Sequence, residues 1–305
     1  MLEFSEDYFK EEVRCDFTIS EKMKRAWAAE MEVLSEIIRV CKKYEITYYA
    51  NWGTLLGAIR HQGYIPWDDD LDISLKRKDY RKLLKVLPDE LPESYHVSSL
   101  YTPGDHSQPI SCVMNSKVIL TDQEMIKKFH GCPFIAGVDI DPLDYIPKDK
   151  ELAETQRVLY NVVYDAAHRY EELEQSGELE QFLPKIEEFC KFSFDKSKPL
   201  KKQLWILSDT ICSLYGETES DYLTWFPRTI RGNKNFRFPK EWFAYTIEMP
   251  FENMQIAVPN GYDQILTLLY GDYKIPMRDS RGAHDYPFYK KQEEFLARIN
   301  KQQIE

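Results

Sequence analysis

Residues 50–75 read Ala-Asn-Trp-Gly-Thr-Leu-Leu-Gly-Ala-Ile-Arg-His-Gln-Gly-Tyr-Ile-Pro-Trp-Asp-Asp-Asp-Leu-Asp-Ile-Ser-Leu. This stretch places four carboxylates within five positions, at Asp68, Asp69, Asp70 and Asp72. Like charges a few ångströms apart repel, and each disfavours the ionised form of its neighbour. Divalent cations that prefer oxygen ligands are the usual remedy in proteins. The stretch therefore predicts a metal site, and most of the functional interpretation starts from it.

The end of the stretch has the pattern of a β-strand. Residues 71–75 alternate apolar and polar side chains, as a half-buried strand does. Side chains two positions apart lie on the same face of a strand. Asp70 and Asp72 are therefore expected to point to the same side, where both can reach one metal ion.

A calcium-binding loop is one alternative for this cluster. Asp68, Asp70 and Asp72 match the first three ligand positions of an EF-hand. However, Ile73 stands where that loop requires glycine, and Asp79 stands where it requires glutamate. The calcium loop is therefore excluded. A solvated acidic loop is the plainer alternative, but such a loop would not usually continue straight into an alternating strand.

A second acidic cluster, residues 138–144, follows an expected strand at 134–140. Its Asp139 supplies a third carboxylate for the metal site. In two-metal phosphoryl transfer, carboxylates from adjacent strands hold the ions, and a carboxylate can also take the proton of an attacking hydroxyl. The alternative for Asp139 is a residue at a strand end that bonds to a turn.

Gly53 and Thr54 lie where a β-type run changes to a helical pattern. Backbone N–H groups at a helix start, together with a threonine hydroxyl, form a cradle for phosphate. An ordinary helix cap explains the same two residues. The sequence contains neither the Walker phosphate-binding motif nor the Gly-x-Ser-x-Gly motif of serine hydrolases.

Several cationic side chains are candidates for binding phosphate oxygens. Arg60 and His61 lie inside the segment between the glycines and the acidic cluster. Arg278, Arg281 and His284 form a second group near the end of the chain.

The composition is that of a globular protein, and it excludes some functions. The chain has 305 residues, of which 43% are hydrophobic and 30% charged, and its net charge is −11. Nucleic acid is not expected as a partner, because that binding depends on cationic side chains that neutralise phosphates. A phosphorylated substrate must therefore be held by a local feature.

Features of the sequence also predict where the protein works. We expect no transmembrane helix, because no sufficiently long apolar run occurs, and the first residues lack the pattern of a signal peptide. Six scattered cysteines without a Cys-x-x-Cys pair are typical of reduced thiols in a cytosolic protein. We expect a cytoplasmic protein. The basic stretch at 76–85 is most simply a solvated helix face, and contact with the inner face of the membrane is the alternative.

The chain as a whole predicts an α+β fold in three segments. Residues 1–147 are expected to form an N-terminal helix and a catalytic core, 148–250 a mainly helical subdomain, and 251–305 a segment that packs back on the core. A capping box at 18–21 is expected to open the first helix. Helices are expected up to residue 44, at 54–60, 78–86, within 148–215, at 262–270 and from 288, and strands at 46–51, 71–75, 95–100, 110–119, 134–140 and 253–258.

Three motifs carry a family resemblance. The first is Gly-Thr-Leu-Leu-Gly-Ala-Ile-Arg-His at 53–61, followed by Gly63 and by Ile-Pro-Trp-Asp-Asp-Asp-Leu-Asp-Ile at 65–73. The second is Asp-Ile-Asp-Pro-Leu-Asp at 139–144, and the third is Leu-Tyr-Gly-Asp-Tyr at 269–273 with Arg281 and His284. Together they resemble the LicD family, which is related to the fukutin proteins and belongs to the nucleotidyltransferase-fold superfamily.

The resemblance implies a small mixed sheet flanked by helices, with a metal site on it. By analogy, Asp70 and Asp72 bind Mg²⁺ or Mn²⁺, Asp68 assists, and Asp139 completes the site. Gly53, Thr54, Arg60, His61, Trp67, Arg281 and His284 are then the candidates for binding substrate and phosphate.

The resemblance also implies an activity. Members transfer a phosphorylated alcohol from a nucleotide-diphosphate donor to a glycan hydroxyl, for example phosphocholine from CDP-choline to teichoic acid or to lipopolysaccharide sugars. Aromatic residues such as Trp52 and Trp67 can enclose a quaternary ammonium group. The family usually has an aromatic residue where Asp141 stands, so the donor and the glycan or lipid-linked acceptor stay open. The alternatives are transfer of a nucleotide or of ribitol or glycerol phosphate, and a non-catalytic relative that binds glycan or metal.

Overall fold

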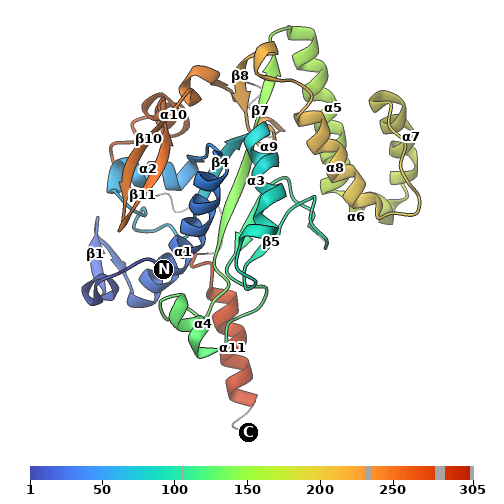
Figure 1. The fold of residues 1–305 in the computed structure, drawn as a ribbon. Helices are drawn as coiled ribbons and strands as arrows, with labels where there is room; N and C mark the ends of the chain where they lie inside the picture. The colour runs from blue at the N-terminus through green and yellow to red at the C-terminus, as the bar shows by residue number, and fades with distance from the viewer. Residues whose placement is uncertain (105, 231–234, 279–285, 303–305) are drawn as a thin grey trace. The chain divides into compact units, whose positions relative to one another are not determined.

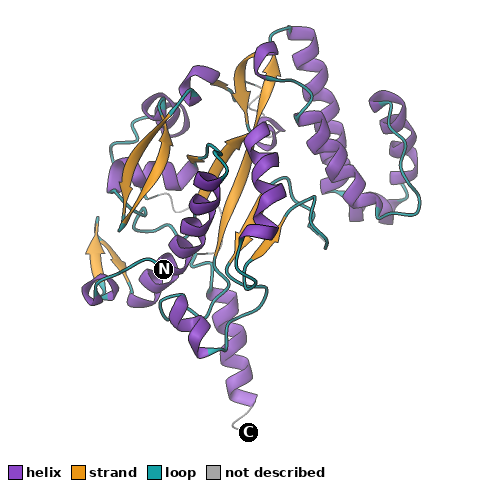
Figure 2. Ribbon diagram, viewed as in Figure 1, coloured by secondary structure: helices purple, strands orange, loops and turns teal. Residues whose placement is uncertain are grey.

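The computed structural model describes residues 1–104, 106–230, 235–278 and 286–302 (Figure 1). By its internal contacts the chain divides into two compact units, the first formed by residues 1–97, 112–140 and 242–305 and the second by 98–111 and 141–241. Both units contain helices and strands (Figure 2), so the predicted α+β class is confirmed. The three expected segments, with boundaries after 147 and 250, stay a prediction.

A sheet with the strand order β3-β4-β7-β6-β5 carries the acidic residues. β3 is antiparallel to β4, and their register pairs Tyr49 with Ser74 and Ala50 with Ile73. The strands are β3 (Tyr49–Ala50), β4 (Asp72–Lys76), β5 (His96–Ser98), β6 (Ser111–Met114) and β7 (Gly137–Pro147).

The first long helix, α1, begins two residues later than a capping box at 18–21 would place it. Its N-cap is Ser20, whose hydroxyl accepts a hydrogen bond from the N–H of Met23 at 3.2 Å. The predicted cap at Thr18 is wrong because Thr18 belongs to strand β2, which pairs with β1. The predicted apolar face is confirmed: Met23, Trp27, Met31, Leu34, Ile38 and Cys41 are all buried.

A hairpin near the end of the first unit was only half predicted. The expected strand at 253–258 is β11, and it pairs antiparallel with β10, for which the sequence gives little signal. Pro250 and exposed Glu248 weaken the strand pattern of β10. Both are tolerated because, among the residues that the structure describes, β10 and β11 form a two-stranded sheet in which β10 is an edge strand. The other elements of this unit are η1 (Glu6–Phe9), β1 (Glu12–Arg14), β2 (Phe17–Ile19), α1 (Glu21–Lys43), α2 (Trp52–His61), α3 (Arg77–Glu90), α4 (Gln123–Lys128), β10 (Thr246–Phe251), β11 (Met254–Pro259), α10 (Tyr262–Tyr270) and α11 (Lys290–Gln302).

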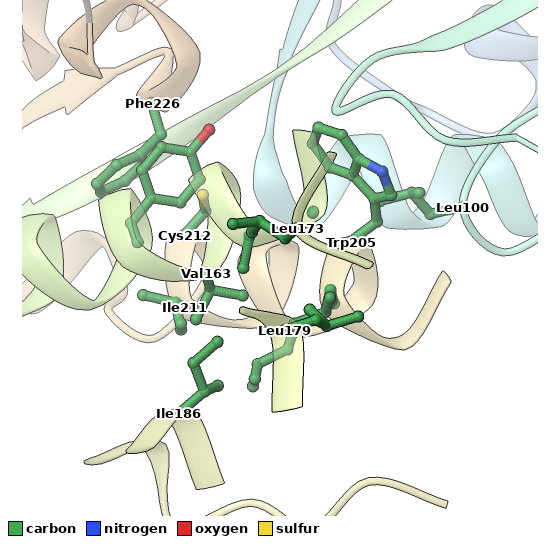
Figure 3. Packing of buried hydrophobic residues seen from close by; sticks show 14 residues of the cluster. Leu100, Val163, Leu173, Leu179, Ile186, Trp205, Ile211, Cys212 and Phe226 are labelled. Carbon is green, nitrogen blue, oxygen red and sulfur yellow. The ribbon is translucent and has the colours of Figure 1, made fainter. Parts of the chain in front are cut away.

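The second unit has its own apolar core, drawn in Figure 3. In it the ring of Tyr160 lies 5.1 Å from that of Phe226, and Tyr164 contacts Trp205 edge-on at 5.2 Å. The helical pattern predicted for 148–215 is confirmed by α5 to α8. The elements of this unit are α5 (Lys150–His168), α6 (Tyr170–Ser176), α7 (Leu179–Cys190), α8 (Leu200–Cys212), η2 (Glu217–Glu219), β8 (Ser220–Thr224), α9 (Phe226–Ile230) and β9 (Phe238–Pro239), and 3-10 helix η3 (Lys240–Phe243) follows at its end.

Strand β7 is much longer than predicted. The expected end at Ile140 is wrong, since the strand continues to Pro147 through the second acidic cluster. Asp144 is 1% exposed and is paired with Thr224 of β8. Asp144 therefore continues the strand because it pairs within the second unit.

Two expectations about cysteines and membrane helices concern the whole chain. The six cysteines are free. Among the helices in the described part of the chain, none has the length and apolar character needed to span a membrane.

Candidate active site

The first turn of helix α2 holds the start of β4 in place. The N–H of Asp72 donates to the hydroxyl of Thr54 at 2.8 Å, and the N–H of Asn51 donates to the carbonyl of Asp72 at 3.0 Å. Both main-chain polar groups of Asp72 are thus bonded to the segment that opens α2. This tether fixes the backbone from which the Asp72 carboxylate projects.

From Asp70 to Ile73 the side chains alternate as expected for a strand, but Ser74, expected on the more exposed side, is buried as well. Leu71 and Ile73 are at most 1% exposed, whereas Asp70 and Asp72 are half-buried. Asp69 is fully buried, and its carboxylate accepts a hydrogen bond from the N–H of Phe288. Asp69 therefore has a structural role, while Asp70 and Asp72 are partly exposed.

Asp139 lies beside this cluster, at the start of β7. Its N–H donates to the carbonyl of Leu71 at 2.8 Å, and β4 and β7 are neighbours in the sheet (Figure 1). Burial raises the pKa of the Cys112 thiol on β6, and the charges of Asp139 and Asp72 both add to the effect. The carboxylates of Asp72 and Asp139 therefore both act on the Cys112 thiol, while their joint role in a metal site stays a prediction.

Asp68 packs against the opening of α2. A Cβ added to Gly53 would lie 2.2 Å from Oδ2 of Asp68, so a larger residue would require the Asp68 carboxylate to move. An anionic group is favourable there, because a helix N-terminus carries partial positive charge. The Thr54 hydroxyl bonds to Asp72, and the Asp68 carboxylate lies beside Gly53, so phosphate binding at these two residues stays a prediction.

Trp52, the first residue of α2, has an unusual backbone. Its φ is 41°, in the left-handed region that bulky residues rarely adopt. Such a conformation costs about 1–3 kcal/mol and tends to occur at functional sites. The strain lies next to Gly53, at the point where α2 meets the acidic strand.

The donor chemistry of these residues fits a hard divalent cation. Carboxylate oxygens are the ligands that Mg²⁺ and Mn²⁺ prefer. Asp72 and Asp139 offer them from two adjacent strands, and Asp70 offers them from the residues just before β4. Within the described ranges, no group of three or more His, Cys, Asp or Glu side chains is gathered as a metal site requires. Metal binding by these residues therefore stays a proposal, based on donor type and strand position.

A further carboxylate next to the cluster was missed from the sequence. Glu30 of α1 is 2% exposed and accepts a hydrogen bond from the Tyr64 hydroxyl at 2.9 Å. Burial raises the pKa of Glu30, and the nearby charges of Asp69 and Asp70 raise it further. An acidic residue on the apolar face of a helix is the signal that could have identified it.

The loop from α2 to the acidic cluster is anchored by Glu252, which also was not predicted. The Glu252 carboxylate accepts from the N–H of Tyr64 at 3.2 Å and from Nη1 of Arg14 at 2.6 Å. Its own N–H donates to the carbonyl of Gln62 at 2.7 Å. Gly63 leaves the space for this side chain, since a Cβ there would lie 2.2 Å from Oε1 of Glu252.

Arg60 joins the first motif to the third. Its Nη1 donates to the carbonyl of Tyr273 at 2.9 Å, and the Tyr273 hydroxyl donates to Asp263 of α10 at 2.6 Å. Its Nε donates to Nε2 of His61 at 2.8 Å. Arg281 and His284, the other candidates of the third motif, lie outside the described residues.

The bond from Arg60 makes His61 a neutral acceptor. An imidazole nitrogen that accepts a hydrogen bond carries no proton. Burial lowers the pKa of His61 from 6.5 to about 4, and the charge of Arg60 contributes. At neutral pH, His61 is therefore expected to be uncharged, so it orients Arg60 and does not serve as a second cation.

This assignment predicts a pH dependence of stability. Because the pKa of His61 is lower in the folded than in the unfolded state, the unfolded state binds more protons between about pH 4 and pH 6.5. The free energy of unfolding should therefore fall as the pH is lowered through this window. In His61→Gln, whose amide oxygen can still accept from Arg60, the fall should be smaller. Urea unfolding across the window measures both slopes, and equal slopes would contradict the assignment.

Comparisons with known proteins agree with the motifs. Residues 45–102 match the family model described as LicD/FKTN/FKRP, nucleotidyltransferase domain. The chain is 27% identical over 258 residues to the lipopolysaccharide cholinephosphotransferase LicD of Haemophilus influenzae, which covers 83% of this chain and 92% of that protein. An uncharacterised protein of Rickettsia prowazekii is 42% identical over 67 residues, which are 22% of this chain and 25% of that protein. An uncharacterised protein of Rickettsia typhi is 42% identical over 72 residues, which are 24% of this chain and 22% of that protein.

Proposed function

Because the chain belongs to the LicD family, we propose that it transfers phosphocholine from CDP-choline to a hydroxyl of a cell-surface glycan precursor, with lipopolysaccharide sugars as the first acceptor class to test. The observation that carries this proposal is the placement of Asp72 and Asp139 on neighbouring strands, with Asp139 bonded to Leu71 and the main chain of Asp72 fixed by the segment that opens α2. The similarity to the Haemophilus protein supports the choice of phosphocholine and of a lipopolysaccharide acceptor.

The acidic residues have two roles in the proposed reaction, metal binding and proton transfer. Asp70, Asp72 and Asp139 would hold Mg²⁺ or Mn²⁺, with Asp68 assisting from the opening of α2. A bound cation of this kind would neutralise the negative charge of the donor diphosphate. Asp139 also takes the proton of the acceptor hydroxyl, whose oxygen attacks the phosphorus that bears choline, and CMP leaves.

The cationic and polar residues act on the phosphates. Arg60, held by His61 and the Tyr273 carbonyl, offers guanidinium N–H groups to the charge that develops in the transition state. Gly53 and Thr54 would place the main chain of α2 next to a phosphate. In this proposal the donor and the glycan hydroxyl would meet beside Asp72 of β4 and Asp139 of β7.

The place of the reaction is also a proposal. A lipid-linked acceptor would be met at the cytoplasmic face of the membrane. Lys78, Arg81, Lys82 and Lys85 of α3 are exposed, so they could contact anionic lipid there. A solvated helix face explains the same residues, and vesicle sedimentation with and without anionic lipid separates the two.

A donor assay tests the proposed function directly. The protein is incubated with CDP-choline, Mg²⁺ and lipooligosaccharide that lacks phosphocholine, and both CMP release and the mass of the glycan are followed. We expect CMP and a glycan heavier by one phosphocholine group, and we expect EDTA to abolish both and added Mg²⁺ or Mn²⁺ to restore them.

The same assay separates the alternatives. A glycan heavier by a nucleotide, or turnover only with CDP-ribitol or CDP-glycerol, would replace phosphocholine with another group. Metal binding in the absence of any donor turnover would indicate a non-catalytic relative. Turnover that is indifferent to EDTA would remove the metal from the mechanism.

A further inference from the structure

Three aromatic rings from distant parts of the chain meet next to the acidic cluster. The ring of Trp67, one residue before Asp68, lies 6.3 Å from that of Phe17 on β2 at an interplanar angle of 70°. Phe17 in turn lies 6.0 Å from Tyr286, at 75°. The Phe17 ring thus stands nearly edge-on to both Trp67 and Tyr286, so its face is turned in a different direction from theirs. We call Phe17, Trp67 and Tyr286 the aromatic group.

The aromatic group is not part of a closed core. All three side chains are half-buried, whereas the stacked pair Trp27 and Tyr64 is almost fully buried. Trp and Tyr are often only partly buried, so partial exposure alone does not indicate a function. What it does here is leave parts of these rings accessible to a ligand beside the acidic cluster.

A cation already lies on one of these rings, and negative charge lies close by. Cζ of Arg278 is 4.7 Å from the centre of the Phe17 ring, within the range of a cation–π contact. Arg278 is exposed, so its side chain can leave this position at little cost. Burial raises the pKa of the Tyr286 hydroxyl, and the nearby charge of Asp69 raises it further.

These features match the needs of one chemical group. A quaternary ammonium has no N–H to donate, so proteins recognise it with several aromatic faces and with nearby carboxylates. A primary ammonium or a hydroxyl would instead be recognised by hydrogen-bond acceptors. The aromatic group supplies the faces, and the acidic cluster that begins at Asp68 supplies the charge.

We propose that Phe17, Trp67 and Tyr286 bind the trimethylammonium group of the donor and make the enzyme selective for choline over alcohols without a quaternary ammonium. The proposal rests on the proposed function, which it makes specific. The position of Trp67 in the chain suits this role, because Trp67 directly precedes Asp68 and the acidic cluster. The choline end of CDP-choline would lie on the rings while its diphosphate faces the carboxylates.

The test compares donors in variants that lose one ring. The ratio of kcat/KM for CDP-choline to that for CDP-ethanolamine is measured in the wild type, in Phe17→Leu and in Trp67→Leu. Because one cation–π contact corresponds to a factor of about 5–30, each variant should lower this ratio by roughly that factor. Phe17→Tyr and Trp67→Phe, which keep an aromatic face, should largely retain it. Phe189→Leu, a change of an exposed ring on α7 of the second unit, is the matched control.

Two binding measurements keep the test independent of turnover and of folding in the variants. Calorimetry of CDP-choline without acceptor should show weaker binding in Phe17→Leu by a similar factor. In the wild type, tetramethylammonium should displace CDP-choline at concentrations where ammonium does not. Equal donor ratios in the wild type and both leucine variants, or equal effects of the two ammonium ions, would overturn the proposal.

The outcomes distinguish this proposal from the proposed function. Phosphocholine transfer with unchanged donor ratios would leave the function standing and refute the role of the rings. Binding of CDP-choline that depends on the rings, without any phosphocholine transfer, would support the rings and refute the function.

Discussion

The Asp70→Asn variant is expected to keep its fold and to lose at least about a hundredfold in kcat/KM for CDP-choline. Removing one group that stabilises transition-state charge in a preorganised site typically costs about 10²–10³ in rate. Asparagine has nearly the same shape as aspartate, but it carries no charge and turns an N–H donor toward the neighbouring carboxylates. Asp70 is half-buried beside fully buried Asp69, so the change should remove charge with little effect on packing.

Stability gives a second readout of this variant that does not depend on activity. Without metal, the loss of one of several mutually repelling carboxylates should leave the thermal unfolding temperature unchanged or slightly higher. A cation that binds only the folded state stabilises the wild type by mass action. Added Mg²⁺ should therefore raise the unfolding temperature of the wild type and have a weaker effect on Asp70→Asn.

Asp89→Asn, on the exposed surface of α3, is the matched control, and it should behave as the wild type in both measurements. Full activity of Asp70→Asn, or an equal response of the wild type and the variant to Mg²⁺, would refute the role of Asp70 as a metal ligand.

Local periodicity explains which parts of this site could be predicted. The alternation over residues 71–75 identifies the strand that carries Asp72, and the three- and four-residue spacing identifies the buried face of α1. Both patterns depend on neighbours in the sequence. The acidic residues of the first motif were therefore found without any knowledge of the tertiary structure.

The partners of these residues could not be predicted in the same way. The hydroxyl of Thr54 was expected to face a phosphate, and in the structure it accepts the N–H of Asp72, eighteen positions further on. Glu252 supports the loop at Gly63 from a turn nearly two hundred residues away. Neither contact can be predicted from neighbouring residues in the sequence, because each joins segments that only the tertiary structure brings together.

Trp67 shows the same limit for ligand recognition. The sequence suggests an aromatic enclosure and offers Trp52 as the partner of Trp67. The rings that contact Trp67 include Phe17 and His61, and Phe17 brings in Tyr286. The sequence alone indicates that aromatic residues are involved. Which aromatic residues contact one another can be known only from the folded structure.

Gly57→Ala is expected to have the largest effect on stability among the changes in the first motif. Gly57 lies in the middle of α2, where alanine would normally stabilise a helix by about 1 kcal/mol. Here a Cβ would lie 2.3 Å from the carbonyl oxygen of Gly63 and 3.4 Å from the N–H nitrogen of Ile65. The nearest atom belongs to the backbone, so no side-chain rotation can relieve the clash.

In Gly57→Ala the higher helix propensity of alanine is opposed by the steric clash with Gly63. The destabilising effect of the clash should be the larger of the two. Inserting a methyl group into a closely packed site costs about 1–3 kcal/mol, and more where the backbone must move. The free energy of unfolding from urea titration should fall accordingly. Gly216→Ala is the matched control, because its Cβ would meet only the Glu219 carboxylate at an ordinary 3.7 Å, and its effect should stay within about 0.5 kcal/mol.

The position of the clash connects stability with catalysis. Gly63 belongs to the loop that is anchored by Glu252 and that leads to Asp68, so displacing it shifts the acidic cluster relative to α2. Transfer activity should therefore fall in Gly57→Ala even at temperatures where the variant is folded. If the variant loses stability but keeps full activity when folded, the loop is only a connection between elements. If activity falls in the folded variant, the close contact of two backbones at Gly57 and Gly63 is part of what positions the carboxylates for the reaction.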